Sequence, residues 1–138
     1  MASTSVPKFF MPESAFSAAD LRNFAILETA FGDALWEVLR AYILIGETAC
    51  EKLQEATTCA HWQEAVRLAL KIASTAADLD LRAVADAGRA FAAAVYEDNT
   101  AHTRRNAAQM VVLEFEKSRM MLESRYPGLV ETGGASIA

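Results

Sequence analysis

The chain has 138 residues, of which 53% are hydrophobic, and it carries a formal net charge of −5 at pH 7. This length suits one domain with a substantial core, and the negative charge argues against binding to the phosphate backbone of nucleic acid. The first residues lack the apolar segment of a signal peptide, and no stretch reaches the roughly 18 uninterrupted apolar residues of a membrane span. We therefore expect a cytoplasmic protein that binds neither nucleic acid nor membranes.

The polar residue types give no sign of a metal or cofactor site. Cys50 and Cys59 are the only cysteines, and His61 and His102 the only histidines. Their spacing matches no zinc motif, and neither a phosphate-binding loop nor a nucleophile elbow occurs. We expect two reduced cysteines, no metal and no cofactor.

The chain begins with an expected flexible arm over residues 1–15, in which the apolar cluster Phe9, Phe10 and Met11 either packs on the body or contacts a partner. Ser17 and Asp20 form a capping pattern. A short helix is predicted to follow from about Ala18 to Ala30, with an inward row made of Leu21, Phe24, Ala25 and Leu27.

A second helix is predicted from about Ala34 to Ala56. Gly32 and Asp33 interrupt the preceding pattern, and Asp33 is placed to cap the new helix. Apolar residues recur at helical spacing along it and predict a buried row of Leu35, Val38, Leu39, Tyr42, Ile45, Ala49 and Leu53.

A third helix, from Thr58 to Leu79, has the clearest amphipathic pattern in the chain. Thr58 is the expected cap of this helix, and Asp80 the expected cap of the next one. Two neighbouring apolar rows predict a wide buried stripe composed of Trp62, Val66, Ala69, Ala73, Ala76, Ala65, Leu68, Ile72 and Leu79.

The opposite side of this third helix is polar and is interrupted by one leucine. Steps of three and four residues place Gln63, Arg67, Lys71, Ser74 and Asp78 side by side, with Leu70 among them. An exposed leucine is common on protein surfaces. An apolar centre with a charged rim is also the composition of a small protein interface.

Two further helices complete the pattern. The fourth, Leu81 to Tyr96, has an inward row of Leu81, Val84, Gly88, Phe91 and Val95, in which Gly88 allows close helix approach. The fifth, Ala101 to Arg125, is capped by Asn99 or Thr100 and packs through Ala107, Met110, Val111, Phe115, Ser118 and Leu122. Trp36, Tyr42 and Trp62 are expected in the core, and the methionines Met110, Met120 and Met121 are expected to pack.

Together these elements predict an all-α protein. No proline occurs between Pro12 and Pro127, and helices joined by short links run antiparallel to their neighbours. We expect an antiparallel up-down four-helix bundle with a short additional N-terminal helix across one end. The bundle would cover residues 16–126, followed by a disordered tail over residues 127–138.

The segment RLALKIASTAADL, Arg67 to Leu79, resembles the signature helix of histidine-containing phosphotransfer (HPt) domains, which typically reads R-x-x-A-H-x-L-K-G-S-A-x-x-L-G. Matching positions hold Ala69, Ile72, Thr75, Ala76 and Leu79. Three departures matter more than these matches: Leu70 replaces the phosphorylated histidine, Ala73 the lysine and Ser74 the glycine. The run from Gly32 to Ile43 also resembles the second helix of that family.

The resemblance implies the bundle fold without the family's chemistry, because leucine has no nitrogen that could accept a phosphoryl group. It implies a non-enzymatic protein whose face of Gln63, Arg67, Leu70, Lys71 and Ser74 docks a response-regulator receiver domain or a histidine kinase. Such a protein would be a monomer or a weak homodimer and would modulate two-component signalling.

Two alternatives stay open. The bundle could be a scaffold or dimerising protein unrelated to phosphorelay. It could also be an active phosphotransfer protein that uses His102, since Ala101 to Ala108 echoes the acceptor motif with Arg105 in place of the lysine and Asn106 in place of the glycine. His61 is expected at the surface.

Overall fold

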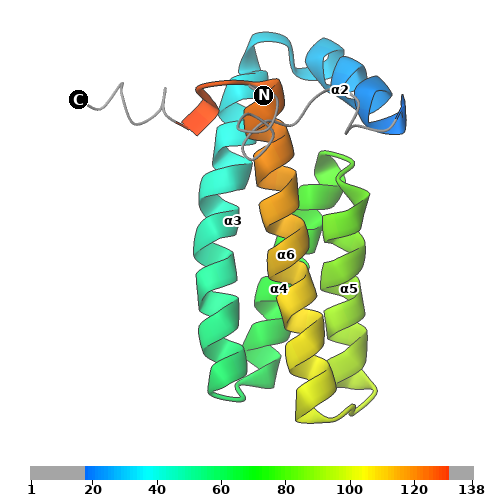
Figure 1. Ribbon diagram of the computed structural model, residues 1–138, viewed down its shortest axis with the longest axis vertical. Helices are drawn as coiled ribbons and strands as arrows, with labels where there is room; N and C mark the ends of the chain where they lie inside the picture. Colours follow the sequence, from blue (N-terminus) through cyan, green and yellow to red (C-terminus); the bar gives the residue numbers. More distant parts are fainter. Residues whose placement is uncertain (1–17, 131–138) are drawn as a thin grey trace, which may run out of the picture. The chain divides into compact units, whose positions relative to one another are not determined.

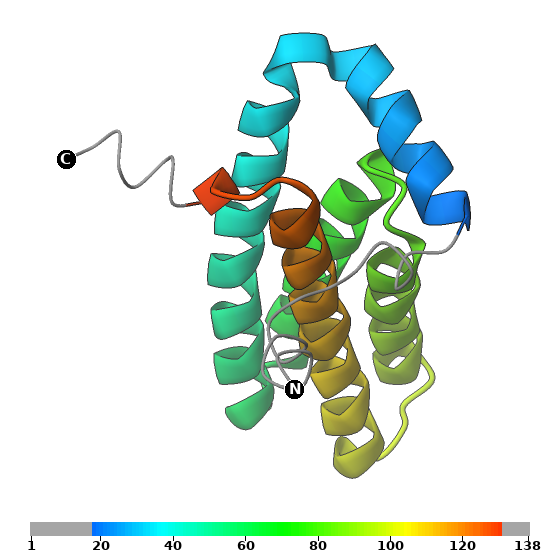
Figure 2. The same ribbon diagram turned by 45° about the horizontal axis from the view of Figure 1, so that its top comes forward.

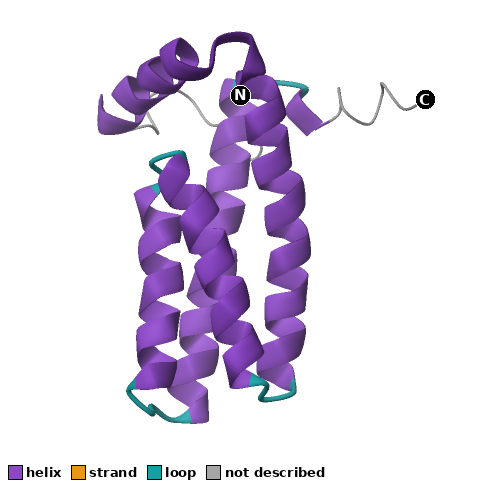
Figure 3. Ribbon diagram, turned by 180° about the vertical axis from the view of Figure 1, so that it is seen from behind, coloured by secondary structure: helices purple, strands orange, loops and turns teal. Residues whose placement is uncertain are grey.

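The computed structural model describes residues 18–130 of the chain, with side chains from Arg22 onward. This part of the chain contains helices and turns and no strand (Figure 3), which confirms the all-α prediction. The elements are α2 (Ala18–Phe31), the 3-10 turn η2 (Gly32–Ala34), α3 (Leu35–Thr58), α4 (Trp62–Asp78), α5 (Arg82–Tyr96) and α6 (Ala101–Arg125). The expected arm at Phe9 to Met11, the cap at Ser17 and the side chain of Leu21 lie outside the described residues.

Contacts divide the chain into two units. One unit, here the terminal unit, comprises residues up to Arg40 together with those from Arg119 onward. The other, here the bundle unit, runs from Ala41 to Ser118. Helices α3 and α6 therefore each contribute one segment to both units.

The bundle unit consists of four antiparallel helical segments: the part of α3 from Ala41, then α4, α5 and the part of α6 up to Ser118 (Figure 1). The links between them are short, covering residues 59–61, 79–81 and 97–100. Links of this length force each helix to run back beside the previous one. The up-down four-helix bundle predicted from the sequence is thus confirmed.

The core of the bundle unit is built on the apolar stripe of α4. Its buried residues are Ala65, Val66, Leu68, Ala69, Ile72, Ala73, Ala76 and Leu79, as the helical periodicity predicts. Phe91 of α5 and Val111 and Phe115 of α6 are fully buried in the same unit. Trp62 is only half-buried, and the guanidinium of Arg104 lies 5.0 Å from its ring centroid.

Two glycines allow close packing within the bundle unit. A Cβ at Gly46 of α3 would collide with the ring of Phe115, so the aromatic side chain occupies the space that the glycine leaves. A Cβ at Gly88 of α5 would stand 2.7 Å from the carbonyl oxygen of Ala69 and 2.8 Å from the Cβ of Ala73. The close helix approach expected at Gly88 is confirmed.

All three links in the bundle unit use the same C-terminal motif. Each contains one residue with positive φ, namely Ala60 (57°), Asp80 (58°) and Asp98 (59°). In the first link the N–H of His61 donates to the carbonyl of Ala56 at 2.8 Å, and the N–H of Ala60 donates to that of Thr57 at 3.2 Å. The other two links repeat this pair of bonds, which defines the Schellman motif.

This motif corrects two of the predicted caps. Thr58 ends α3, where its hydroxyl donates to the carbonyl of Gln54 at 2.8 Å, and α4 begins only at Trp62. Asp80 is the left-handed residue of its link, and its carboxylate pairs with Arg82 at 3.2 Å. Both residues serve the end of a helix and not the start of the next.

Of the other two predicted helix caps, Asp33 is wrong and Thr100 is confirmed. Asp33 lies inside η2 and does not cap α3, which begins at Leu35 after the 3-10 turn. Thr100 does cap α6, because its hydroxyl oxygen accepts the N–H of Thr103 at 3.1 Å.

Four apolar residues expected to pack inward are exposed instead, one of them Ala25 of α2. Ile45 of α3 is 46% exposed, Met110 of α6 is 45% exposed and Met120 is 46% exposed. On α3, Ile43 and not Ile45 packs inward beside Tyr42, and Ile43 is fully buried. The run Tyr42-Ile-Leu-Ile45 is apolar throughout, and a helix cannot turn four successive residues toward one side.

A buried hydroxyl chain connects α3 and α6 inside the bundle unit. The hydroxyl of Ser118 donates to the carbonyl of Phe115 at 2.7 Å, so the phenol of Tyr42, 2.9 Å away, donates to Ser118. Burial raises the pKa of Tyr42 above its ordinary value, which keeps the phenol neutral. Nearby, burial and then the charges of Glu116 and Glu47 raise the pKa of the Cys50 thiol to about 12.

In the terminal unit, α2 leads through η2 into the start of α3 (Figure 2). Its apolar centre contains Phe24, Leu27, Leu35, Leu39 and Leu129, all buried. Leu129 is fully buried and its carbonyl accepts a bond from Arg40 at 3.3 Å. This bond ties the residues that follow α6 to α3.

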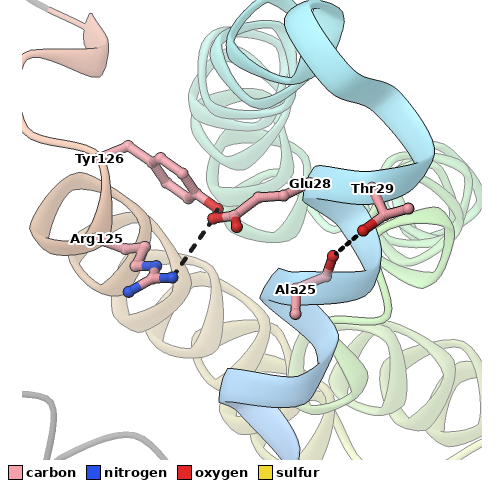
Figure 4. A network of polar contacts seen from close by, with 5 residues as sticks. All are labelled: Ala25, Glu28, Thr29, Arg125 and Tyr126. Carbon is pink, nitrogen blue, oxygen red and sulfur yellow. Dashed lines mark hydrogen bonds and ion pairs between the residues drawn. The ribbon is translucent and has the colours of Figure 1, made fainter.

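Glu28 of α2 makes the polar contacts that join α2 to the end of α6 within this unit (Figure 4). Its carboxylate accepts the phenol of Tyr126 at 2.7 Å and a guanidinium N–H of Arg125 at 3.5 Å. The ring of Tyr126 meets Phe24 and Trp36 edge to face, each with centroids 6.1 Å apart. Burial and then the hydrogen bond to Glu28 raise the pKa of Tyr126 to about 12.

Candidate partner-binding face on helix α4

The polar side of α4 is a continuous exposed surface in the bundle unit. All five residues singled out from the sequence, Gln63, Arg67, Leu70, Lys71 and Ser74, are exposed; we refer to them as the α4 face. They stand at helical steps on one element, so the helix alone brings them together. Leu70 lies in the middle of this face with 38% of its surface exposed.

Arg67 is held in place on the α4 face by Glu64, one turn earlier. Its Nε donates to Oε1 at 2.9 Å and its Nη2 donates to Oε2 at 2.6 Å, in a bidentate pair. The hydrogen bond from Arg67 lowers the pKa of Glu64, and the bond to Glu64 raises the pKa of Arg67. Both side chains are exposed, so the pair orients the guanidinium and adds little stability.

A groove of about 300 Å³ runs beside the α4 face, between α3 and α4. We call it the α3/α4 groove; its lining residues are Leu44, Ile45, Thr48, Ala49, Lys52, Arg67, Leu68 and Lys71. Ala49 and Leu68 are buried, whereas Leu44 and Ile45 are 48% and 46% exposed. The groove shares Arg67 and Lys71 with the α4 face, so the two form one continuous surface.

The α3 side of this surface was missed from the sequence. Ile45 was assigned to the core, and Leu44 and Lys52 were not assigned to any site. The apolar run Tyr42 to Ile45 was the available signal, since part of any such run on a helix must face away from the core. The sequence alone does not give the rotation of α3 against α4 that decides which part.

Position 73, which the resemblance aligns with the lysine of the HPt pattern, is closed to solvent. Ala73 is 2% exposed and packs where α5 approaches most closely, at Gly88. Ser74, by contrast, is exposed. The cations near Leu70 are therefore Arg67 and Lys71, because the packing of α5 against α4 leaves no room for one at position 73.

Neither histidine belongs to the α4 face. His61 is exposed and precedes the first residue of α4. His102 is exposed in the first turn of α6, where one of its ring nitrogens lies 3.2 Å from the side-chain nitrogen of Asn106. Cys59 is exposed, Cys50 is buried, and both are free.

The described residues contain neither a metal-binding cluster nor a membrane-spanning helix. Between residues 18 and 130, no three histidine, cysteine or acidic side chains gather into a set that could hold a metal ion. No helix in the same range has the length and apolar character needed to cross a membrane.

Comparisons of this chain with protein-family models, with characterised proteins and with solved structures find no match. The class that the geometry defines is an antiparallel four-helix bundle whose second bundle helix, α4, presents a leucine among polar and basic residues.

Proposed function

We propose that this protein is a non-catalytic relative of HPt domains that binds a response-regulator receiver domain or a histidine kinase through the α4 face. The observation that supports this proposal is the exposure of Leu70 at the position of the family's histidine, with Arg67 and Lys71 beside it. Apolar centres with polar rims are typical of small protein interfaces.

A protein of this kind acts by occupancy. It competes with true phosphotransfer proteins for a receiver, or it holds the receiver in one state. Binding shifts a receiver between its two states only if the affinities for those states differ. The regulatory part of the proposal therefore requires different affinities for the phosphorylated and unphosphorylated receiver.

The test is affinity capture from a lysate of the native host, with captured proteins identified by mass spectrometry. Wild type is compared with Leu70→Asp and with Met110→Asp, a control of similar exposure on α6. We expect the wild type and Met110→Asp to capture at least one receiver-domain or histidine-kinase protein that Leu70→Asp loses. Both substitutions are at the surface and should change the free energy of unfolding by only about 0.5 kcal/mol.

Two results would contradict the proposal. One is the absence of any receiver or kinase among the captured proteins, and the other is equal capture by Leu70→Asp. For a captured receiver, affinities measured in both phosphorylation states then test the regulatory part. Phosphate on His102 after incubation with a kinase would instead indicate a catalytic phosphotransfer protein, provided that acid removes the label, as it does from phosphohistidine.

A further inference from the structure

The α3/α4 groove has a mixed lining of apolar and basic side chains. Ala49 and Leu68 form its buried floor, and Leu44 and Ile45 stand half-exposed along one side. The hydroxyl of Thr48 donates to the carbonyl of Leu44 at 3.3 Å and so is satisfied within its own helix. The floor of the groove therefore favours an apolar side chain, and the basic residues of its lining favour an acidic one.

The charged residues that line the groove are all cationic. They are Lys52, Arg67 and Lys71, and no carboxylate is among the lining residues, although the chain as a whole has a net charge of −5. Glu64 neutralises Arg67 through the bidentate pair. Lys52 and Lys71 are exposed and form no ion pair in the described part of the chain, although the charge of Lys52 contributes to the lowered pKa of Glu64. Both ammonium groups are therefore accessible to a partner.

We infer that the α3/α4 groove binds an amphipathic helix of the partner, with leucine-type side chains inserted between Leu44, Ile45 and Leu68 and with glutamate or aspartate residues against Lys52 and Lys71. The class of partner in this inference rests on the proposed function. The chemistry of the bound segment rests on the residues that line the groove. Helices that place apolar residues in a groove between two helices are a common recognition mode.

Two features of the groove disfavour a second copy of this chain as its occupant. Pairing the groove with itself around a twofold axis would bring the cations of both copies together, which costs binding energy. The apolar surface is also small, since only Leu44 and Ile45 are half-exposed there, whereas a stable dimer buries about 800 Å² on each partner. A separate partner with carboxylates fits both features.

The test uses two synthetic peptides of about 18 residues, long enough to form helix in water. Both carry the same leucine stripe, and the polar positions are glutamate in one and lysine in the other. Each is titrated into the isotope-labelled full chain and followed by amide NMR shifts. We expect the glutamate peptide to shift Leu44, Ile45, Thr48 and Lys71 and to bind at least about tenfold more tightly than the lysine peptide at low salt.

Variants then locate the binding. Ile45→Asp and Lys71→Glu should each lower the affinity for the glutamate peptide by about tenfold. The matched controls Met110→Asp and Lys117→Glu on α6 should leave that affinity unchanged. Equal affinity for the two peptides, shifts outside the groove, or no saturable shift would overturn the inference. So would a dimer in sedimentation that Ile45→Asp dissociates, because the groove would then be occupied by a second copy.

The proposed function and this inference can fail separately. If Leu70→Asp loses a captured receiver while Ile45→Asp retains it and the two peptides bind alike, the function stands and the groove assignment is wrong. If the glutamate peptide binds in the groove but no receiver or kinase is captured, the groove assignment stands and the function is wrong.

Discussion

A Cβ atom on Gly88 would stand 2.7 Å from the carbonyl oxygen of Ala69, so α5 rests on the backbone of α4. The same atom would be 2.8 Å from the Cβ of Ala73. Neither a backbone carbonyl nor an alanine Cβ can rotate away, unlike the end of a long side chain. Any residue larger than glycine at position 88 therefore has to separate the two helices.

Gly88→Ala should destabilise the protein even though alanine is the better helix former. Helix propensity alone favours the alanine by about 1 kcal/mol, whereas overpacking typically costs about 1–3 kcal/mol. We expect a net loss of about 1–2 kcal/mol in the free energy of unfolding, measured by urea denaturation. A Gly88→Ala variant as stable as the wild type would mean that α5 can shift away from α4 at little cost.

The reverse exchange at Ala60 should stabilise the protein. Ala60 is exposed and has a φ of 57°, a left-handed conformation that costs a residue with a Cβ about 1–2 kcal/mol. Ala60→Gly removes that cost, partly offset by the greater entropy of glycine in the unfolded chain. We expect a gain of about 0.5–1 kcal/mol by urea denaturation. A loss of stability would contradict the assigned Schellman geometry.

These two sites show why the fold could be predicted while the turns could not. The stripe of α4 was predicted correctly because alanine, leucine and isoleucine there follow a 3.6-residue period without ambiguity. The ends were misplaced because the left-handed residues of the links are Ala60, Asp80 and Asp98. Glycine is the usual signal for this position, and without it Thr58 and Asp80 looked like the beginnings of helices.

The α4 face was predictable for the same reason as the stripe, since one amphipathic helix fixes both of its sides. The α3/α4 groove could not be predicted, because Leu44 and Ile45 occur in an apolar run that is compatible with two rotations of α3 about its axis. Packing determines the rotation, because Ile43 is fully buried and the ring of Phe115 lies against Gly46. Met110 was misassigned similarly, because α6 carries apolar residues on both its buried and its exposed sides.

Tyr126 should make stability depend on pH in the alkaline range. Its pKa is raised from 10.0 to about 12, by burial and then by the hydrogen bond to Glu28. The unfolded chain therefore loses this proton at lower pH than the folded chain, so the stabilising effect is complete below pH 10 and is lost as the pH rises toward 12.

The variant Tyr126→Phe isolates this effect. It should be less stable than the wild type at neutral pH by about 1 kcal/mol, since it lacks the bond to Glu28. The difference between the two proteins should shrink as the pH rises from 10 to 12, because only the wild type has the phenol to ionise. Urea denaturation at a series of pH values gives both numbers. A constant difference would show that the phenol titrates alike in the folded and unfolded chains.

The two cysteines should differ sharply in reactivity. Cys59 is exposed, whereas Cys50 is buried and its pKa is raised to about 12. Because the thiolate is the reactive form, a thiol reagent should label Cys59 at once in the native protein. Cys50 should react more slowly by a factor on the order of 10³ or more, through transient opening. Mass spectrometry of labelled peptides over time measures both rates, and comparable rates would contradict the burial of α3 at this point.

The histidine and the lysine of the HPt pattern should be tolerated differently at the two positions of α4 that the resemblance aligns with them. Leu70 is partly exposed, so Leu70→His should fold with a change in the free energy of unfolding within about 1 kcal/mol. Ala73 is 2% exposed beside Gly88, so Ala73→Lys must bury a cation or displace α5. We expect it to cost more than about 3 kcal/mol.

The matched control for Ala73→Lys is Ala77→Lys, the same exchange one turn later on α4 at an exposed position. Ala77→Lys should leave the urea midpoint nearly unchanged, because lysine is a good helix former in water. Equal midpoints for the two lysine variants would mean that α5 yields at Gly88 and that a cation can reach the side of Leu70. The expected difference would mean that the contact between α4 and α5 closes position 73 to a cation, whichever residue stands at position 70.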